Sequence, residues 1–141
     1  MKNPKKRLDS ELNKIFDALS SKFAKTSFIL SKLNLSELTK EINRFELKFS
    51  TESLLKLYLY KKVKGVHHHT KINKHLLANE DEALDLGFIR DKNNNIQIPH
   101  KRTINEFLQL KLKKGVRKKL DILAQNILSL ANKKGIILDL R

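Results

Sequence analysis

The feature that most constrains the fold is residues 52–63, a segment that is apolar on almost all sides when drawn as a helix. Ser50 or Thr51 can cap its first turn, and Gly65 can end it. A helix without a polar face has to be covered all round by other elements. The sequence therefore predicts a multi-helix bundle with this segment at its centre. Its apolar side chains are Leu54, Leu55, Leu57, Tyr58, Leu59 and Tyr60.

The N-terminal third of the chain supplies amphipathic segments that can cover this helix. Ser10 can cap a first helix, whose apolar residues recur at helical spacing as far as Phe23. Residues 26–33 predict a second, shorter helix. Ser36 can cap a third helix that continues to about Phe49.

Two short helices are expected after the central one. Thr70 can cap a helix over residues 71–77, and Asn79 can cap another over residues 80–86. Gly87 can provide a left-handed stop for the second of them. Two short helices joined by so tight a turn have helix-turn-helix proportions.

A turn-rich segment and a further helix follow. Residues 88–98 place an Asn-rich turn between two apolar pieces, which is typical of either a small β-hairpin or an ordered loop. Thr103 and Glu106 have the spacing of a capping box, in which each side chain bonds the other residue's backbone N–H. We expect this box to begin a helix that runs to about Lys114.

The last part of the chain combines a long helix with a short strand. Residues 116–133 carry apolar side chains at alternating spacings of four and three, which predicts packing against another helix, with a homodimeric coiled coil as the alternative. Residues 136–140 are apolar and β-branched, so they predict the start of a strand. The expected fold class is therefore mainly α, with strand character only near residues 88–98 and 136–140.

The net charge restricts the partner of this protein. The chain has 30 Lys and Arg against 15 Asp and Glu, a formal net charge of +15 at pH 7. This excess points to an anionic partner, most commonly nucleic acid, although a Lys-rich proteome can also produce it. The absence of Cys excludes disulfides and thiolate zinc sites and fits a reducing compartment. No apolar run reaches the roughly 18 residues of a membrane span, so we expect no membrane association.

The basic residues are concentrated in stretches that contain no acid. By contrast, residues 80–85 are strongly acidic, so phosphates would repel that helix and we do not expect it in a DNA groove. The cations that we expect to contact DNA are Lys61, Lys62, Lys64, Lys71, Lys74, Lys101, Arg102, Lys111, Lys113, Lys114, Arg117 and Lys118.

The helix expected over residues 103–114 is our candidate for base recognition. Asn105 and Gln109 lie on its successive turns, and both side chains can bond an adenine edge bidentately in the major groove. Its N-terminal dipole adds to the charges of Lys101 and Arg102, and both favour phosphate. The alternative is that Asn105 and Gln109 simply face solvent.

The sequence contains no common enzyme motif. No P-loop, GxGxxG, GxSxG or HExxH pattern occurs, and no pair of carboxylates is spaced for acid–base catalysis. His67, His68, His69 and His75 suggest a metal site, but adjacent histidines point in different directions and no acid stands at ligand spacing. We interpret them as part of a basic loop or helix entry. We therefore expect no enzyme activity, no metal and no cofactor.

The middle of the chain has a characteristic order of features. A Leu-rich helix is followed by the turn Val63-Lys64-Gly65-Val66, a short helix over residues 71–76, a Leu-Gly-Phe ending at Phe88, and Pro99 four residues before a Thr. This order resembles the N-terminal region of insertion-sequence transposases of the DDE type. In that family, Ser often stands at the position of His100.

The resemblance covers residues 54–139 and implies both a function and a location. The family's N-terminal helical part binds the transposon ends, which implies sequence-directed binding of double-stranded DNA in the cytoplasm of a prokaryote, at the nucleoid. An RNase H-like catalytic domain follows it in the family, with a first catalytic acid on its first strand. Asp139 is similar to that acid, although Leu140 and Arg141 follow it where the family often has Thr or Ser. Without a second Asp and a Glu after it, we expect no two-metal chemistry in this chain.

These observations divide the chain into three parts. We expect an N-terminal helical region over residues 1–50, a helical DNA-binding region over residues 51–134, and the start of a truncated RNase H-like domain over residues 135–141. Two other functions remain open: a structural or oligomerisation module that uses the apolar helices, and general RNA or DNA binding. Aromatic residues make up 6% of the chain and mostly fall on apolar helical faces, so no base-stacking platform is visible.

Overall fold

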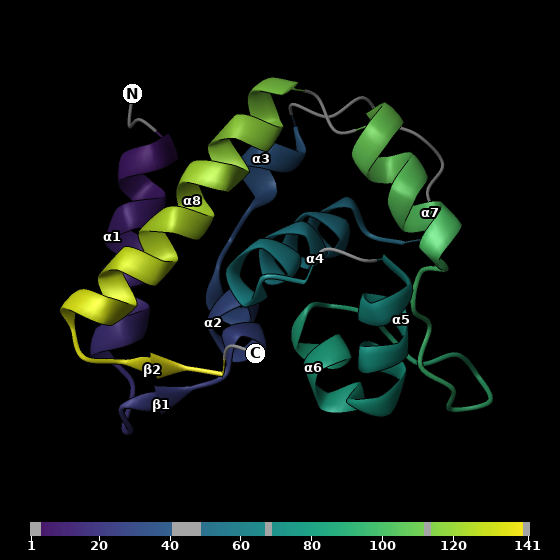
Figure 1. Ribbon diagram of the computed structural model, residues 1–141, viewed down its shortest axis with the longest axis horizontal. Coiled ribbons are helices and arrows are strands. Elements are labelled where there is room, and N and C mark those ends of the chain that lie inside the picture. The colour runs from purple at the N-terminus through teal and green to yellow at the C-terminus, as the bar shows by residue number, and fades with distance from the viewer. Residues whose placement is uncertain (1–3, 41–48, 67–68, 112–113, 140–141) are drawn as a thin grey trace.

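The structure is a computed structural model that describes residues 4–40, 49–66, 69–111 and 114–139. These residues fold mainly into helices and include a two-stranded parallel sheet, which confirms the expected mainly α class (Figure 1). In chain order the elements are α1 (Pro4–Asp17), β1 (Phe23–Ala24), α2 (Thr26–Lys32), α3 (Ser36–Thr39), α4 (Thr51–Lys64), α5 (His69–Ala78), α6 (Glu80–Asp85), α7 (Lys101–Glu106), the π-helical turn η1 (Phe107–Lys111), α8 (Lys114–Lys133) and β2 (Ile137–Leu138).

Helix α4 lies at the centre of the bundle, as its apolar sequence predicts (Figure 1). All residues from 53 to 60 are buried, and α2, α3 and α8 pack against this helix. Ser50 caps its N-terminus, where the Ser50 hydroxyl accepts a hydrogen bond from the Ser53 N–H at 3.4 Å. Gly65 ends the helix at a φ of +71°. Both predicted ends of this helix are therefore confirmed.

Helix α8 packs against α4 and α1 along its apolar face. Leu120 and Ile127 on this face are completely buried, and Val116 and Leu123 are nearly so. The alternating spacing of apolar residues is thus used for helix packing inside the chain. Because this face is buried, it is not available for a coiled coil with a second chain.

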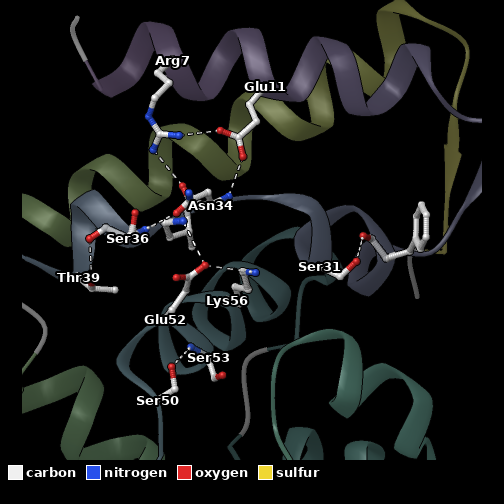
Figure 2. Close-up of polar contacts among 12 residues, drawn as sticks. Arg7, Glu11, Ser31, Asn34, Ser36, Thr39, Ser50, Glu52, Ser53 and Lys56 are labelled. Carbon is white, nitrogen blue, oxygen red and sulfur yellow. Dashed lines mark hydrogen bonds and ion pairs between the residues drawn. The ribbon is translucent and has the colours of Figure 1, made fainter. Parts of the chain in front are cut away.

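A series of polar contacts ties α1 to the segment before α3 and to α4 (Figure 2). Arg7 donates a hydrogen bond to the Glu11 carboxylate at 2.8 Å, and Glu11 also accepts one from the Asn34 N–H at 2.7 Å. Glu52, in the first turn of α4, accepts a hydrogen bond from the Leu35 N–H at 3.2 Å. These contacts hold the N-terminal helices on the core that α4 organises.

Three details of the N-terminal region differ from the prediction. Helix α1 begins at Pro4 rather than at Ser10, because Pro is well suited to the first position of a helix. The helix ends before Phe23, which lies in β1 and not on a helical face. Ser36 lies inside α3 and does not cap it. The expected continuation of that helix over residues 41–48 lies outside the described residues.

Helices α5 and α6 are the two short helices that the sequence predicts, and they pack against each other. Gly87 follows α6 at a φ of +98°, and a Cβ there would lie 2.5 Å from the Ser53 hydroxyl, so the position requires Gly. The predicted caps are wrong. Thr70 lies inside α5, and Asn79 caps nothing because its amide donates back to the His75 carbonyl at 2.8 Å.

Residues 88–98 form an ordered loop with one isolated antiparallel bridge between Arg90 and Ile96. The Asp91 carboxylate closes its turn by accepting a hydrogen bond from the Asn95 N–H at 3.0 Å. Of the two structures compatible with this sequence, the ordered loop is therefore the one observed.

Helix α7 begins before the predicted capping box. His100 caps it, since the imidazole Nδ1 accepts a hydrogen bond from the Arg102 N–H at 3.2 Å. Thr103 and Glu106 consequently lie inside the helix, where Thr103 has no free first-turn N–H groups left to cap. The imidazole supplies an acceptor earlier in the chain than the Thr hydroxyl does. The prediction of a helix here is confirmed, but its capping box and its end near Lys114 are wrong. The α-helix ends at Glu106, the π-helical η1 continues to Lys111, and Lys114 begins α8.

Strands β1 and β2 form a parallel pair that places the segment between α1 and α2 beside the C-terminal end of the described chain (Figure 1). In this pair Phe23 is opposite Ile137 and Ala24 is opposite Leu138. The strand expected near residues 136–140 is therefore confirmed. Its partner strand was not predicted, because two residues of β1 give no recognisable alternation.

Candidate nucleic-acid interface

Residues from three separate segments meet at one pocket between α4, η1 and α8. The pocket has a volume of about 280 Å³. Lys61 and Lys62 reach it from α4, Gln109 from η1 and Arg117 from α8. The sequence predicts each of these side chains to contact DNA. We call this site the α4–η1–α8 pocket.

The pocket carries an excess of positive charge. Lys61, Lys62 and Arg117 are its cations, and Asp121 is the carboxylate among its lining residues. Burial lowers the pKa of Lys61, and the neighbouring charge of Lys62 lowers it further. The lowered pKa thus reflects first the burial of Lys61 and second its closeness to the charge of Lys62.

The Asp121 carboxylate is occupied by contacts within the protein. It accepts a hydrogen bond from the Tyr58 hydroxyl at 2.5 Å and lies 3.6 Å from the Nζ of Lys62. Burial, followed by this hydrogen bond, raises the pKa of Tyr58, so the hydroxyl stays protonated and continues to donate. Asp121 is therefore already bonded to Tyr58 and paired with Lys62, and it is the one carboxylate among the described lining residues.

The guanidinium of Arg117 is not fully used by the fold. Its Nε is buried, and no described residue accepts a hydrogen bond from it. Such an unsatisfied donor costs about 1–3 kcal/mol, which makes an added acceptor near this group favourable. Arg117 also lies in the first turn of α8, where the helix dipole favours an anion.

Most of the other predicted contacts lie outside this pocket. Asn105 is exposed on α7 and is not among the described residues that line the pocket, whereas Gln109 is. The side chain of Lys111 and all of Lys113 lie outside the described residues. The remaining predicted cations that are exposed are Lys71, Lys74, Lys101, Arg102, Lys114 and Lys118.

Lys64 is the exception among the predicted cations, because its side chain is only 9% exposed. Its Nζ lies 3.4 Å from Asp139 Oδ2 and 3.8 Å from Glu82 Oε1, and it also lies over the ring of Tyr60. These contacts place Lys64 inside the protein. Lys64 is therefore engaged by two carboxylates within the protein, unlike the exposed cations predicted to contact DNA.

Asp139 also makes contacts within the chain. Its Oδ1 accepts hydrogen bonds from the Thr26 N–H at 2.6 Å and from the Thr26 hydroxyl at 2.9 Å, and its Oδ2 faces Lys64. These bonds attach the end of β2 to the first residue of α2. In this structure Asp139 thus links the C-terminal end of β2 to the N-terminal end of α2.

Three of the four acids of α6 contact other parts of the protein, and the fourth, Asp81, is exposed. Glu82 is 5% exposed and accepts a hydrogen bond from the Tyr60 hydroxyl at 2.6 Å. Asp85 accepts one from the Ser27 hydroxyl at 2.9 Å, and Glu80 pairs with Arg90. The negative charges of Glu80, Glu82 and Asp85 are therefore engaged within the fold.

Sequence reasoning missed the part played by Asp121. The signal is its spacing, since Asp121 follows Arg117 by four residues and so lies on the same face of α8. In the structure Asp121 is the partner of the Tyr58 hydroxyl.

No described helix is long and apolar enough to cross a membrane. Across the described ranges, no group of three or more His, Asp or Glu side chains is arranged to hold a metal ion. Comparisons of this chain with protein-family models, curated protein sequences and solved structures found no match. The fold and the α4–η1–α8 pocket are therefore the basis for any functional conclusion.

Proposed function

We propose that this protein binds double-stranded DNA in a sequence-directed way, as the transposon-end-binding part of a transposase-type protein, without catalysing a reaction itself. The observation that carries the proposal is the meeting of Lys61, Lys62, Gln109 and Arg117 at one pocket. Charge concentrated at one place steers and binds a polyanion better than the same charge spread over the surface. In this proposal the protein acts at the nucleoid, in the cytoplasm of a prokaryotic cell.

Four further exposed cations lie on α7 and α8, and we call them, together with the cations of the pocket, the basic surface. Lys101 and Arg102 are exposed on α7, and Lys114 and Lys118 are exposed at the start of α8. Helix α7, η1 and the N-terminal end of α8 lie on the same side of the molecule (Figure 1). Contacts from such side chains to phosphates supply affinity and orientation but carry no sequence information.

Base recognition in this proposal comes from the α7–η1 segment. Asn105 and Gln109 are exposed amide side chains, which suit hydrogen bonding to base edges. Gln109 lies at the pocket, so it is close to the proposed phosphate contacts. Asn105 is therefore the better candidate for reading a base.

The positions of the exposed aromatic side chains favour duplex DNA over single-stranded nucleic acid. Binding of single strands depends on aromatic platforms within a basic groove. Phe23 and Phe28 are 71% and 40% exposed, but they lie on β1 and α2, away from α7 and η1 (Figure 1). The described part of the basic surface thus has cations and amides without an exposed aromatic ring.

The test is a binding selection from a random duplex DNA pool in the presence of single-stranded RNA competitor. We expect one duplex motif to be enriched, and Asn105→Ala to change the preferred base at one position. Asn132→Ala is the matched control, because Asn132 is exposed at the other end of α8 and should leave the motif unchanged. Loss of duplex binding to the RNA competitor, or no enriched motif, would contradict the proposal.

A second candidate function is an oligomerisation module, which rests on a different part of the surface. The apolar faces of α4 and α8 are buried within the chain. However, Phe23 and Ile137 are opposite each other on the sheet and are 71% and 55% exposed. A mass measurement in solution tests this candidate, and a dimer that Phe23→Ser converts to a monomer would support it.

A further inference from the structure

The α4–η1–α8 pocket has the size of a site for a small group. At about 280 Å³ it lies just below the range of roughly 300–1,000 Å³ that is usual for drug-sized ligands. Its cations, Lys61, Lys62 and Arg117, come from two helices, and the amide of Gln109 adds a neutral hydrogen-bond donor. Such a donor set fits an oxyanion.

Three features favour a phosphate group as that oxyanion. Among the described lining residues, Lys62 and Arg117 stand beside one carboxylate, that of Asp121, which is already bonded to Tyr58. The first turn of α8 adds the positive end of a helix dipole. A guanidinium such as that of Arg117 matches two phosphate oxygens at once, because its N–H groups form a planar fork.

We infer that the α4–η1–α8 pocket holds one phosphate group of the DNA backbone, with Arg117 and Lys62 as its main contacts and Asp121 as an opposing charge. This inference rests on the proposed DNA binding and adds where the backbone is held. It also assigns opposite effects to two neighbours on α8, since loss of Arg117 should weaken binding and loss of the Asp121 charge should strengthen it.

The opposite effects allow a sharp experiment on the full chain. We would measure the affinity for a labelled duplex as a function of salt for the wild type, Arg117→Gln and Asp121→Asn. Lys133→Gln and Asp17→Asn are the matched controls, because they also remove one positive and one negative charge, respectively. Both residues are exposed, Lys133 at the C-terminal end of α8 and Asp17 at the C-terminal end of α1. Thermal unfolding of each variant checks that it folds, and Asn at position 121 can still accept from Tyr58.

The expected results follow from counterion release. Arg117→Gln should weaken duplex binding about tenfold near 0.1 M salt. It should also make the slope of log K against log salt concentration shallower by about one, which corresponds to the loss of one phosphate contact. Asp121→Asn should strengthen binding by about two- to fivefold, as expected for removal of one partly screened charge. If the wild type binds duplex but both variants behave like their controls, the pocket inference is wrong and the proposed function stands.

A second arm separates backbone phosphate from free phosphate. Inorganic phosphate is added as competitor and compared with chloride at equal ionic strength. A backbone site predicts tight duplex binding that phosphate weakens more than chloride does, in the wild type but not in Arg117→Gln. If the wild type binds no duplex but phosphate raises its melting temperature through Arg117, both the proposed function and the backbone assignment are overturned in favour of a free phosphate ligand.

Discussion

Replacing Asp139 with Ala should destabilise the whole fold. The Asp139 carboxylate accepts two hydrogen bonds from Thr26, at 2.6 Å from its N–H and at 2.9 Å from its hydroxyl. Thr26 is only 1% exposed, so water cannot replace the lost acceptor without a rearrangement. The variant would also remove one of the two carboxylates that face the buried ammonium of Lys64.

The size of the effect can be worked out from these contacts. Leaving a buried donor without its acceptor costs about 1–3 kcal/mol, so the two donors of Thr26 account for about 2–4 kcal/mol after partial relaxation. The ion pair with Lys64 adds little, because the Asp139 side chain is 32% exposed and Lys64 keeps Glu82. For a chain of this length, the loss corresponds to a fall in Tm of roughly 6–15 °C.

Urea unfolding followed by circular dichroism measures this loss. Asp139→Asn should cost less than Asp139→Ala, because the amide oxygen can still accept from Thr26. The matched control is Glu106→Ala, which removes an exposed carboxylate and should change stability by less than about 0.5 kcal/mol. If Asp139→Ala is no more costly than this control, the link between β2 and α2 does not contribute to stability as reasoned here.

Two further substitutions test other parts of the fold. Gly87→Ala should lower the free energy of unfolding by about 2 kcal/mol or more, because it combines a positive φ with a Cβ that lies 2.5 Å from the Ser53 hydroxyl. In urea unfolding, adding Ser53→Ala to the same chain should restore part of this loss. No restoration would argue against the close contact. Lys61→Met should raise the Tm at neutral pH while weakening duplex binding. The pKa of Lys61 is lowered in the folded state, so the charged form of this side chain opposes folding. The stability of the wild type should therefore rise as the pH increases through the lowered pKa towards 10.5. An unchanged Tm in Lys61→Met would contradict this prediction.

The central helix and the packing face of α8 could be predicted because both depend on local periodicity. Residues 53–60 leave no polar face, and all of them are buried. The starts of helices were harder to predict. Ser10 and Thr103 have capping side chains but lie within helices that begin at Pro4 and Lys101. Several residues in one stretch can begin a helix, so a capping side chain alone does not fix the start.

Contacts between distant segments could not be predicted from the pattern. The hydrogen bond between Thr26 and Asp139 joins residues that are 113 positions apart. The α4–η1–α8 pocket likewise depends on how the helices pack, although its cations were identified individually. The burial of Lys64 could have been foreseen, because it follows Tyr60 by four residues and so lies on the same helical face.

The most direct test of DNA binding is the salt dependence of duplex affinity for the wild-type chain. If about five of its cations contact phosphates, the association constant should fall by about 500-fold between 50 and 200 mM salt. A steep, linear fall of log K with log salt is the result that our account predicts. An affinity that stays flat over this range, or the absence of duplex binding at 50 mM salt, would contradict it.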